Sequence, residues 1–310
     1  MSEGREVFGT MPDGTAVHRI RIKGGGLSAA ILTYGAVLQD LRLEGHDAPL
    51  VLGFDTFENY LGHSPYFGAI VGRYANRLRG GRFTIDGERY QADTNFLGKH
   101  LLHGGSAGSG KRVWRLGERG ADFVTLHLTD PDGWMGFPGT LEVSATYRLK
   151  AGGILELAIE ATTDQPTLCN FSHHSYFNLD DGGSGDVLGH RLMLNAGAYL
   201  PVDDELIPTG VVQPVENTPF DFRQARPIRR REGDAIDYDH NFCLTSQRGP
   251  LRQATWVQAA RSGVEMECWT TEPGIQFYAG HKVAREVPGL GGRMYKANAG
   301  FCLEGQVWPD

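Results

Sequence analysis

Leu141-Glu-Val-Ser-Ala-Thr-Tyr-Arg-Leu149 alternates apolar residues with mostly polar ones, and after Gly152-Gly153 the alternation resumes from Leu155 to Ala161. A period of two is the pattern of a strand with one buried face. A glycine pair between two such runs marks a turn. The stretch therefore predicts an antiparallel pair of strands, each burying one face.

Short apolar runs of this kind recur along the chain. They lie between glycines from Ala16 to Leu43, and again at 123–128 and 264–270. Glycine makes up 43 of the 310 residues, about twice its usual share of roughly 7%, which indicates many tight turns between short elements. No linker or internal repeat divides the sequence. We therefore expect residues 1–310 to form one all-β domain, a single large antiparallel β-sandwich.

Two local signals predict specific elements. Asp86-Gly87 lies between the alternating arms 82–85 and 88–91, and this dipeptide favours a two-residue hairpin turn because both central residues need positive φ. Asp55-Thr-Phe-Glu-Asn-Tyr-Leu61 carries a capping residue and an early acid, which predicts one short helix.

Composition excludes several classes of protein. The net charge is -7, so a nucleic-acid partner is not expected. No apolar stretch is long enough to span a membrane. The first residues carry no apolar signal region, and the four cysteines lie far apart, a pattern typical of reduced thiols in the cytoplasm. Monomer and homodimer both remain open.

The stretch from Cys169 to Leu179, Cys-Asn-Phe-Ser-His-His-Ser-Tyr-Phe-Asn-Leu, is unlike a core strand or a surface loop. Its side chains are mostly ones that form hydrogen bonds or move protons. If the backbone is extended, His173 and His174 point to opposite faces, so only one of them can serve a given site.

Four further segments could carry chemistry, although turns, caps and ordinary strands explain each of them as well. In His100-Leu-Leu-His103-Gly-Gly, the glycines would let the backbone approach a ligand closely. Glu304 ends an apolar strand, where a carboxylate is usually paired or functional. The other two segments are Asp237–Phe242 and Thr271–Gly280.

A metal site and a cofactor are not expected. The His-x-x-His spacing of His100 and His103 sits beside glycines and outside any predicted helix, and no carboxylate completes a known pattern of ligands. No Gly-x-Gly-x-x-Gly lies between a strand and a helix, which argues against a dinucleotide.

These segments, in this order, resemble the aldose 1-epimerase (galactose mutarotase) family from residue 68 to the end. The resemblance implies the family's large antiparallel β-sandwich of the mutarotase type, and the interconversion, without a cofactor, of the α and β anomers of a free aldohexose or pentose. The matching residues are Gly72-Arg-Tyr-Ala-Asn-Arg77, Leu102-His-Gly-Gly105, Asn170–Leu179, Asp239–Phe242, Thr271–Tyr278, Phe301–Gln306 and Pro309-Asp310.

The resemblance also implies a role for each matching residue. Glu304 would be the general base and His174 the general acid. His103 would complete the catalytic group, holding the sugar together with Arg73. Asp239 would accept a hydrogen bond from a sugar hydroxyl. The residues expected to line the site are Asn76, Tyr176 and Gln276.

Three features depart from the family pattern. His173 stands where the family more often has a smaller polar residue, and His281 stands where it commonly has Asn. The chain ends at Asp310, soon after the expected base, whereas family members usually continue into further C-terminal strands. Without these strands we expect either a sheet edge or a core face to be exposed.

Three other functions are compatible with the sequence. A sugar-binding module of the same fold would bind without turnover, although binding alone needs no acid–base pair. A hexose-phosphate mutarotase would need a cationic cluster, for which Arg73, Arg77 and Arg79 are the candidates. A glycoside hydrolase would use Glu304 and Asp239 as its two carboxylates and would leave the histidines without a role.

Overall fold

The computed structural model describes residues 4–64, 66–229 and 236–310. The protein is mostly β, and every strand pairing with an assigned register is antiparallel. The chain divides into two compact units. Unit 1 comprises Met1–Asp47 and Phe54–His173, and unit 2 comprises Ala48–Gly53 and His174–Asp310. The expectation of a single domain stays a prediction. None of the described helices is long and apolar enough to cross a membrane.

Unit 1 holds two four-stranded sheets. The first has the order β1-β2-β3-β4, with bounds Arg5–Thr10, Ala16–Gly24, Leu27–Leu32 and Leu38–Leu43. The second has the order β10-β11-β12-β13, with bounds Arg115–Arg119, Phe123–Asp130, Leu141–Lys150 and Ile154–Thr163.

Shorter elements complete unit 1. The helix α1 spans Phe57–His63. Three two-stranded pairings are β6 with β9, β7 with β8, and β5 with β14. Their bounds are Arg77–Leu78 and Leu101–Leu102, Arg82–Ile85 and Glu88–Gln91, and Ala69–Val71 and Ser172–His174.

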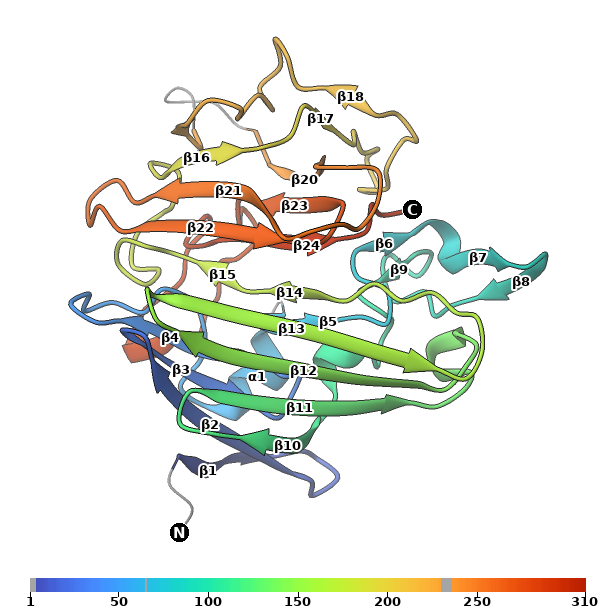
Figure 1. Ribbon diagram of the computed structural model, residues 1–310, viewed down its shortest axis with the longest axis horizontal. Coiled ribbons are helices and arrows are strands. Elements are labelled where there is room, and N and C mark those ends of the chain that lie inside the picture. The colour runs from blue at the N-terminus through green and yellow to red at the C-terminus, as the bar shows by residue number, and fades with distance from the viewer. Residues whose placement is uncertain (1–3, 65, 230–235) are drawn as a thin grey trace. The chain divides into compact units, whose positions relative to one another are not determined.

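Unit 2 is built on a six-stranded sheet of order β15-β24-β23-β20-β17-β18, in which β23 and β24 run side by side (Figure 1). The bounds are Tyr176–Phe177, Phe301–Gln306, Gly274–Tyr278, Asp239–Cys243, Ala198–Tyr199 and Gln213–Pro214. A four-stranded sheet has the order β19-β16-β21-β22, with bounds Arg226–Pro227, Arg191–Leu194, Arg252–Gln258 and Glu265–Thr270.

The structure confirms most of the expected elements. The short helix and the strands within 16–43 form, as do β11 and β22. Asp86 and Gly87 take φ values of 50° and 84° between β7 and β8, the positive values that this hairpin turn requires. All five alternating apolar residues of β12 are buried, from Leu141 to Leu149.

The expected burial of β13 is wrong. Leu155, Leu157 and Ile159 are only half-buried, and Ala161 is exposed. β13 is the last strand of its sheet, so its side chains lack neighbours from a strand on one side. Alternation therefore predicts which residues share a face but not how deeply that face is buried.

The six-stranded sheet of unit 2 has one polar and one apolar face. Residues directly opposed across an antiparallel pair project to the same face, so the registers of β15, β24, β23 and β20 assign each side chain. The polar face carries Tyr176, Asp239, Asn241, Cys243, Gln276, Tyr278, Cys302, Glu304 and Gln306. The opposite face carries Phe177, His240, Phe242, Ile275, Phe277, Phe301 and Leu303, so it is apolar apart from the His240 imidazole.

Candidate active site

Glu304 lies at the centre of the polar face of unit 2. It opposes Gln276 across β23 and β24, and Gln276 in turn opposes Asn241 on β20. Glu304 is only 2% exposed. Because an ionised carboxylate is costly to bury without polar neighbours, the sheet surrounds it with amide side chains.

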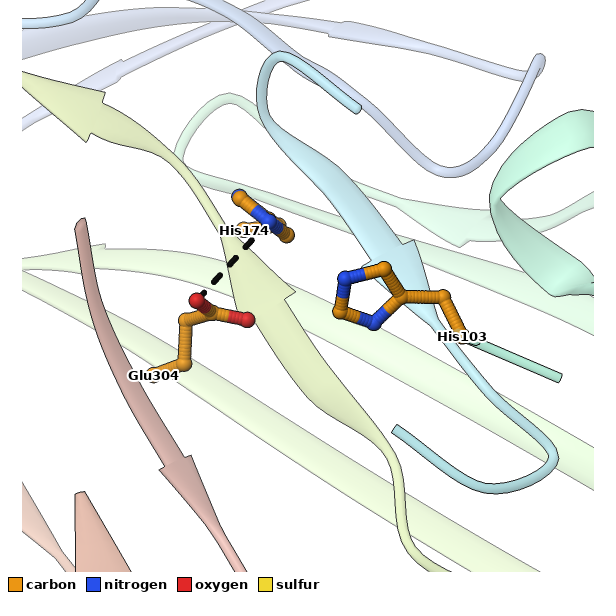
Figure 2. Close-up of side chains that lie close together, drawn as sticks. All are labelled: His103, His174 and Glu304. Atoms are coloured by element: carbon orange, nitrogen blue, oxygen red, sulfur yellow. Dashed lines mark ion pairs between the residues drawn. The ribbon is translucent and has the colours of Figure 1, made fainter. Parts of the chain in front are cut away.

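His174 brings its imidazole to this carboxylate. Its Nε2 lies 3.7 Å from Glu304 Oε1 (Figure 2). The ring stacks on the ring of Tyr176, with 5.1 Å between centroids and an interplanar angle of 22°, while Nδ1 lies 3.5 Å from Cys302 Sγ. The stacking and the sulfur contact restrain the ring, so one imidazole nitrogen faces the carboxylate and the other faces sulfur.

His173 has different surroundings from its neighbour. It is half-buried, and its ring contacts the edge of Tyr147, with 5.8 Å between centroids. β14 is extended through both histidines, so successive side chains alternate between faces. Of the two histidines, only His174 is paired with Glu304.

Asp239 and Gln276 are held together within the same sheet. Gln276 Nε2 donates a hydrogen bond of 2.7 Å to Asp239 Oδ1, which fixes the orientation of the amide. Two phenols stand beside them: burial raises the pKa of Tyr176 and of Tyr278 well above the ordinary value. Both phenols therefore keep their protons near neutral pH and can donate hydrogen bonds.

Asn76 and His103 form a second polar group, in unit 1. The Asn76 N–H donates to His103 Nδ1 at 3.1 Å, and the His103 N–H donates to the Asn76 carbonyl at 2.9 Å. Because Nδ1 accepts, a neutral His103 carries its proton on Nε2 and presents a donor there. Figure 2 also labels His103; within unit 1 its ring contacts the edge of Tyr66, with 4.8 Å between centroids.

The glycine after His103 has a different use from the expected one. Gly104 takes a φ of 80°, and a Cβ there would lie 1.8 Å from the Gly72 carbonyl oxygen. The missing side chain lets two protein backbones pack closely. At Gly104 the close approach is therefore to the protein's own backbone, and the approach of a ligand to this segment stays a prediction.

Arg73 also differs from expectation. Its side chain is 1% exposed; Nη1 donates to the Pro138 carbonyl at 3.0 Å, and Nη2 donates to the carbonyls of Gly139 at 2.9 Å and Asp130 at 3.2 Å. Nε lies 3.6 Å from Asp130 Oδ2. These contacts occupy the guanidinium of Arg73, so its role is to link segments of the protein to one another. The prediction that Arg73 contacts the sugar is corrected accordingly.

Replacing Arg73 should therefore destabilise the fold. Arg73→Met leaves buried carbonyls without a donor. It also removes one of the positive charges next to Asp130. Burial raises the pKa of Asp130, and the charges of Arg112 and Arg73 oppose that rise. We expect a loss of about 3–5 kcal/mol in the free energy of unfolding, measured by urea denaturation. The exposed Arg79, changed to Met, should stay within about 0.5 kcal/mol. If Arg73→Met kept its stability and bound sugar more weakly, the predicted contact between Arg73 and the sugar would be supported instead.

Arg77 is the cation beside the polar group of unit 1. Its Nη1 lies 3.4 Å from Asn76 Oδ1, and its guanidinium lies over the Phe96 ring, 4.8 Å from the centroid. The sequence placed Arg77 only in a possible phosphate cluster. Its position directly after Asn76 in the motif is the sequence signal that places it beside this polar group. Arg73, one of the three arginines that a hexose-phosphate mutarotase would need for a phosphate, donates to protein carbonyls instead.

Comparisons with known proteins identify the family of the chain. Residues 18–310 match the family model described as aldose 1-epimerase. The chain is 40% identical to galactose mutarotase from Rattus norvegicus over 318 aligned residues, covering 100% of this chain and 91% of that protein. It is 35% identical to aldose 1-epimerase from Haemophilus influenzae, covering 96% and 89%.

Solved structures give the same result. An aldose epimerase homologue from C. elegans matches with a TM-score of 0.85 and 31% identity, covering 94% of this chain and 90% of that one. Galactose 1-epimerase from Lactobacillus acidophilus matches with a TM-score of 0.83 and 27% identity, covering 98% and 90%. The chain belongs to the aldose 1-epimerase family, and the predicted family and fold class are confirmed.

Proposed function

We propose that the protein catalyses the interconversion of the α and β anomers of a free aldose, with Glu304 as general base and His174 as general acid. Membership of the aldose 1-epimerase family over the full chain supports the reaction. The observation that carries the two roles is the buried carboxylate–imidazole pair, with 3.7 Å between Nε2 and Oε1.

Ring opening and ring closure each need two proton transfers and no other reagent. Glu304 takes the proton of the C1 hydroxyl while His174 gives a proton to the ring oxygen. The C1–O5 bond then breaks, and C1 becomes an aldehyde. After rotation about the C1–C2 bond, the C5 hydroxyl attacks the other face of the aldehyde, His174 retakes the proton, and Glu304 returns its own.

The environment suits both groups to these tasks. A general acid or base acts within hydrogen-bond reach of the substrate, and distances in a ligand-free site often exceed those in the complex. At 3.7 Å the two side chains are slightly beyond a direct hydrogen bond. Each can therefore turn to a sugar oxygen without first breaking a strong bond to the other.

Sugar binding is assigned to the remaining polar residues. On the sheet of unit 2, Asp239 and Gln276 would accept and donate hydrogen bonds to hydroxyls, and Tyr176 would line the site. For unit 1, the family motif supports a role in sugar binding for the Nε2–H of His103 and for Asn76, and we propose Arg77 in place of Arg73.

Polarimetry on freshly dissolved α-D-glucose and α-D-galactose tests the function. We expect the protein to speed the approach to equilibrium rotation for at least one sugar. If neither rate changes while calorimetry still detects sugar binding, the protein is a binding module. Acceleration only with glucose 6-phosphate would favour the hexose-phosphate alternative.

Chelation tests the expected independence from metal. Histidine and glutamate side chains are also common metal ligands, so His174 and Glu304, which lie 3.7 Å apart, have an alternative use. We expect prolonged dialysis against EDTA to leave the rate of mutarotation unchanged, because a carboxylate and an imidazole suffice for both proton transfers. A rate lost on dialysis and restored by a divalent cation would contradict this mechanism.

A further inference from the structure

The nitrogen of His174 that faces away from Glu304 has a sulfur atom as its neighbour. Cys302 Sγ lies 3.5 Å from Nδ1, within the range of a hydrogen bond to sulfur. Cys302 is fully buried, and it lies on β24 two residues before Glu304, on the same face. One short strand thus supplies both a carboxylate near Nε2 and a thiol near Nδ1.

The thiol is neutral in this environment. Burial raises the pKa of Cys302 well above its ordinary value, and the charges of Glu304 and Asp239 raise it further. Within unit 2, the titratable groups described next to His174 include Cys302, Glu304 and the stacked phenol of Tyr176. A neutral sulfur accepts hydrogen bonds weakly, in contrast to a carboxylate.

We propose that Cys302 is a positioning residue whose sulfur accepts a hydrogen bond from Nδ1–H of His174, which leaves Nε2 as the nitrogen that exchanges a proton with the sugar. The inference rests on the proposed role of His174 as the acid. Cys302 acts through His174, without touching the substrate.

The full reaction cycle needs this tautomer. When the imidazolium gives the Nε2 proton to the ring oxygen, the neutral ring must keep its other proton on Nδ1. Nε2 then holds a lone pair, which retakes the proton from the C5 hydroxyl as the ring closes. If the thiol donated to Nδ1 instead, the neutral ring would carry its proton on Nε2 and could not accept one there.

A thiol is also a better partner than a carboxylate for Nδ1 of His174, the proposed general acid. A carboxylate partner on Nδ1 stabilises the imidazolium, as in serine hydrolases, and would make the ring reluctant to release its proton. A neutral sulfur fixes the direction of Nδ1–H and adds little charge stabilisation. The ring stays oriented while its proton remains easy to transfer.

Nitrogen-15 NMR of the histidine rings tests the inference without turnover. Long-range ¹⁵N–¹H correlations distinguish the two neutral tautomers, and the His174 signals are assigned by their absence in His174→Asn. In wild type we expect neutral His174 to carry its proton on Nδ1. Cys302→Ala should shift the ring toward the Nε2–H tautomer, which free histidine prefers in water.

Kinetics provide the second readout. In Cys302→Ala we expect kcat to fall about tenfold with KM unchanged, the scale of one orienting hydrogen bond. Cys302→Ser keeps an acceptor and should restore both tautomer and rate. Cys268→Ala, a change of a half-buried thiol on β22, should alter neither.

Two results would overturn the inference: an Nε2–H tautomer in wild type, or a Cys302→Ala variant with unchanged tautomer and kcat. Failure of the proposed function looks different. In that case wild type shows no mutarotation, although the NMR signals still report whether Nδ1–H points to sulfur. The two claims are therefore separable in one set of samples.

Discussion

Glu304→Gln should abolish mutarotation while sugar binding survives. The amide keeps the shape of the carboxylate but cannot take the proton of the C1 hydroxyl. General base catalysis typically contributes a factor of about 10²–10⁴, so we expect a loss of kcat on that scale, measured by polarimetry. The dissociation constant from calorimetry should change far less than kcat.

The matched control is Glu267→Gln, an exposed carboxylate on β22 of the other sheet of unit 2. It makes the same chemical change and should leave the rate unaltered. If Glu304→Gln instead retained most of its activity, Glu304 would not be the base. A loss of sugar binding in step with kcat would assign the residue to binding.

His174→Asn should cost far more activity than His173→Asn. His174 faces Glu304 through Nε2, whereas His173 packs against Tyr147. Asparagine can donate a hydrogen bond but cannot transfer a proton near neutral pH. We therefore expect kcat to fall by a factor of about 10²–10⁴ for His174→Asn, against a small loss for His173→Asn, both measured by polarimetry.

This pair of variants separates catalysis from packing because the two residues are adjacent on one strand. Thermal unfolding of each variant shows how much of any loss comes from stability. Equal losses of kcat at equal stability would mean that His173 shares the acid role. That result would contradict the assignment drawn from the alternation of β14.

The sequence predicted those parts of the fold that short-range physics determines. Asp86-Gly87 made a hairpin because the turn itself demands positive φ. The buried face of β12 followed from its alternation. The burial of β13 did not follow, because the position of a strand at the end of its sheet depends on pairings remote in the chain.

The site was predictable to the same extent. The roles of Glu304 and His174 came from a family motif, and the register of β23 and β24 then explains how Gln276 comes to oppose Glu304. Arg73 and Arg77 lie in one motif and are chemically identical. Their surroundings differ because the guanidinium of Arg73 donates hydrogen bonds to the carbonyls of Pro138 and Gly139. These carbonyls lie more than sixty residues away in the sequence, so the motif alone does not reveal the difference.

The most direct test of the central claim is NMR magnetisation exchange between the anomeric protons of an equilibrated sugar, with wild type and Glu304→Gln side by side. At equilibrium no net reaction occurs, so transfer between the α and β signals reports interconversion at C1 alone. The account predicts rapid exchange with wild type and only the uncatalysed rate with Glu304→Gln. Equal exchange rates for the two proteins would contradict it.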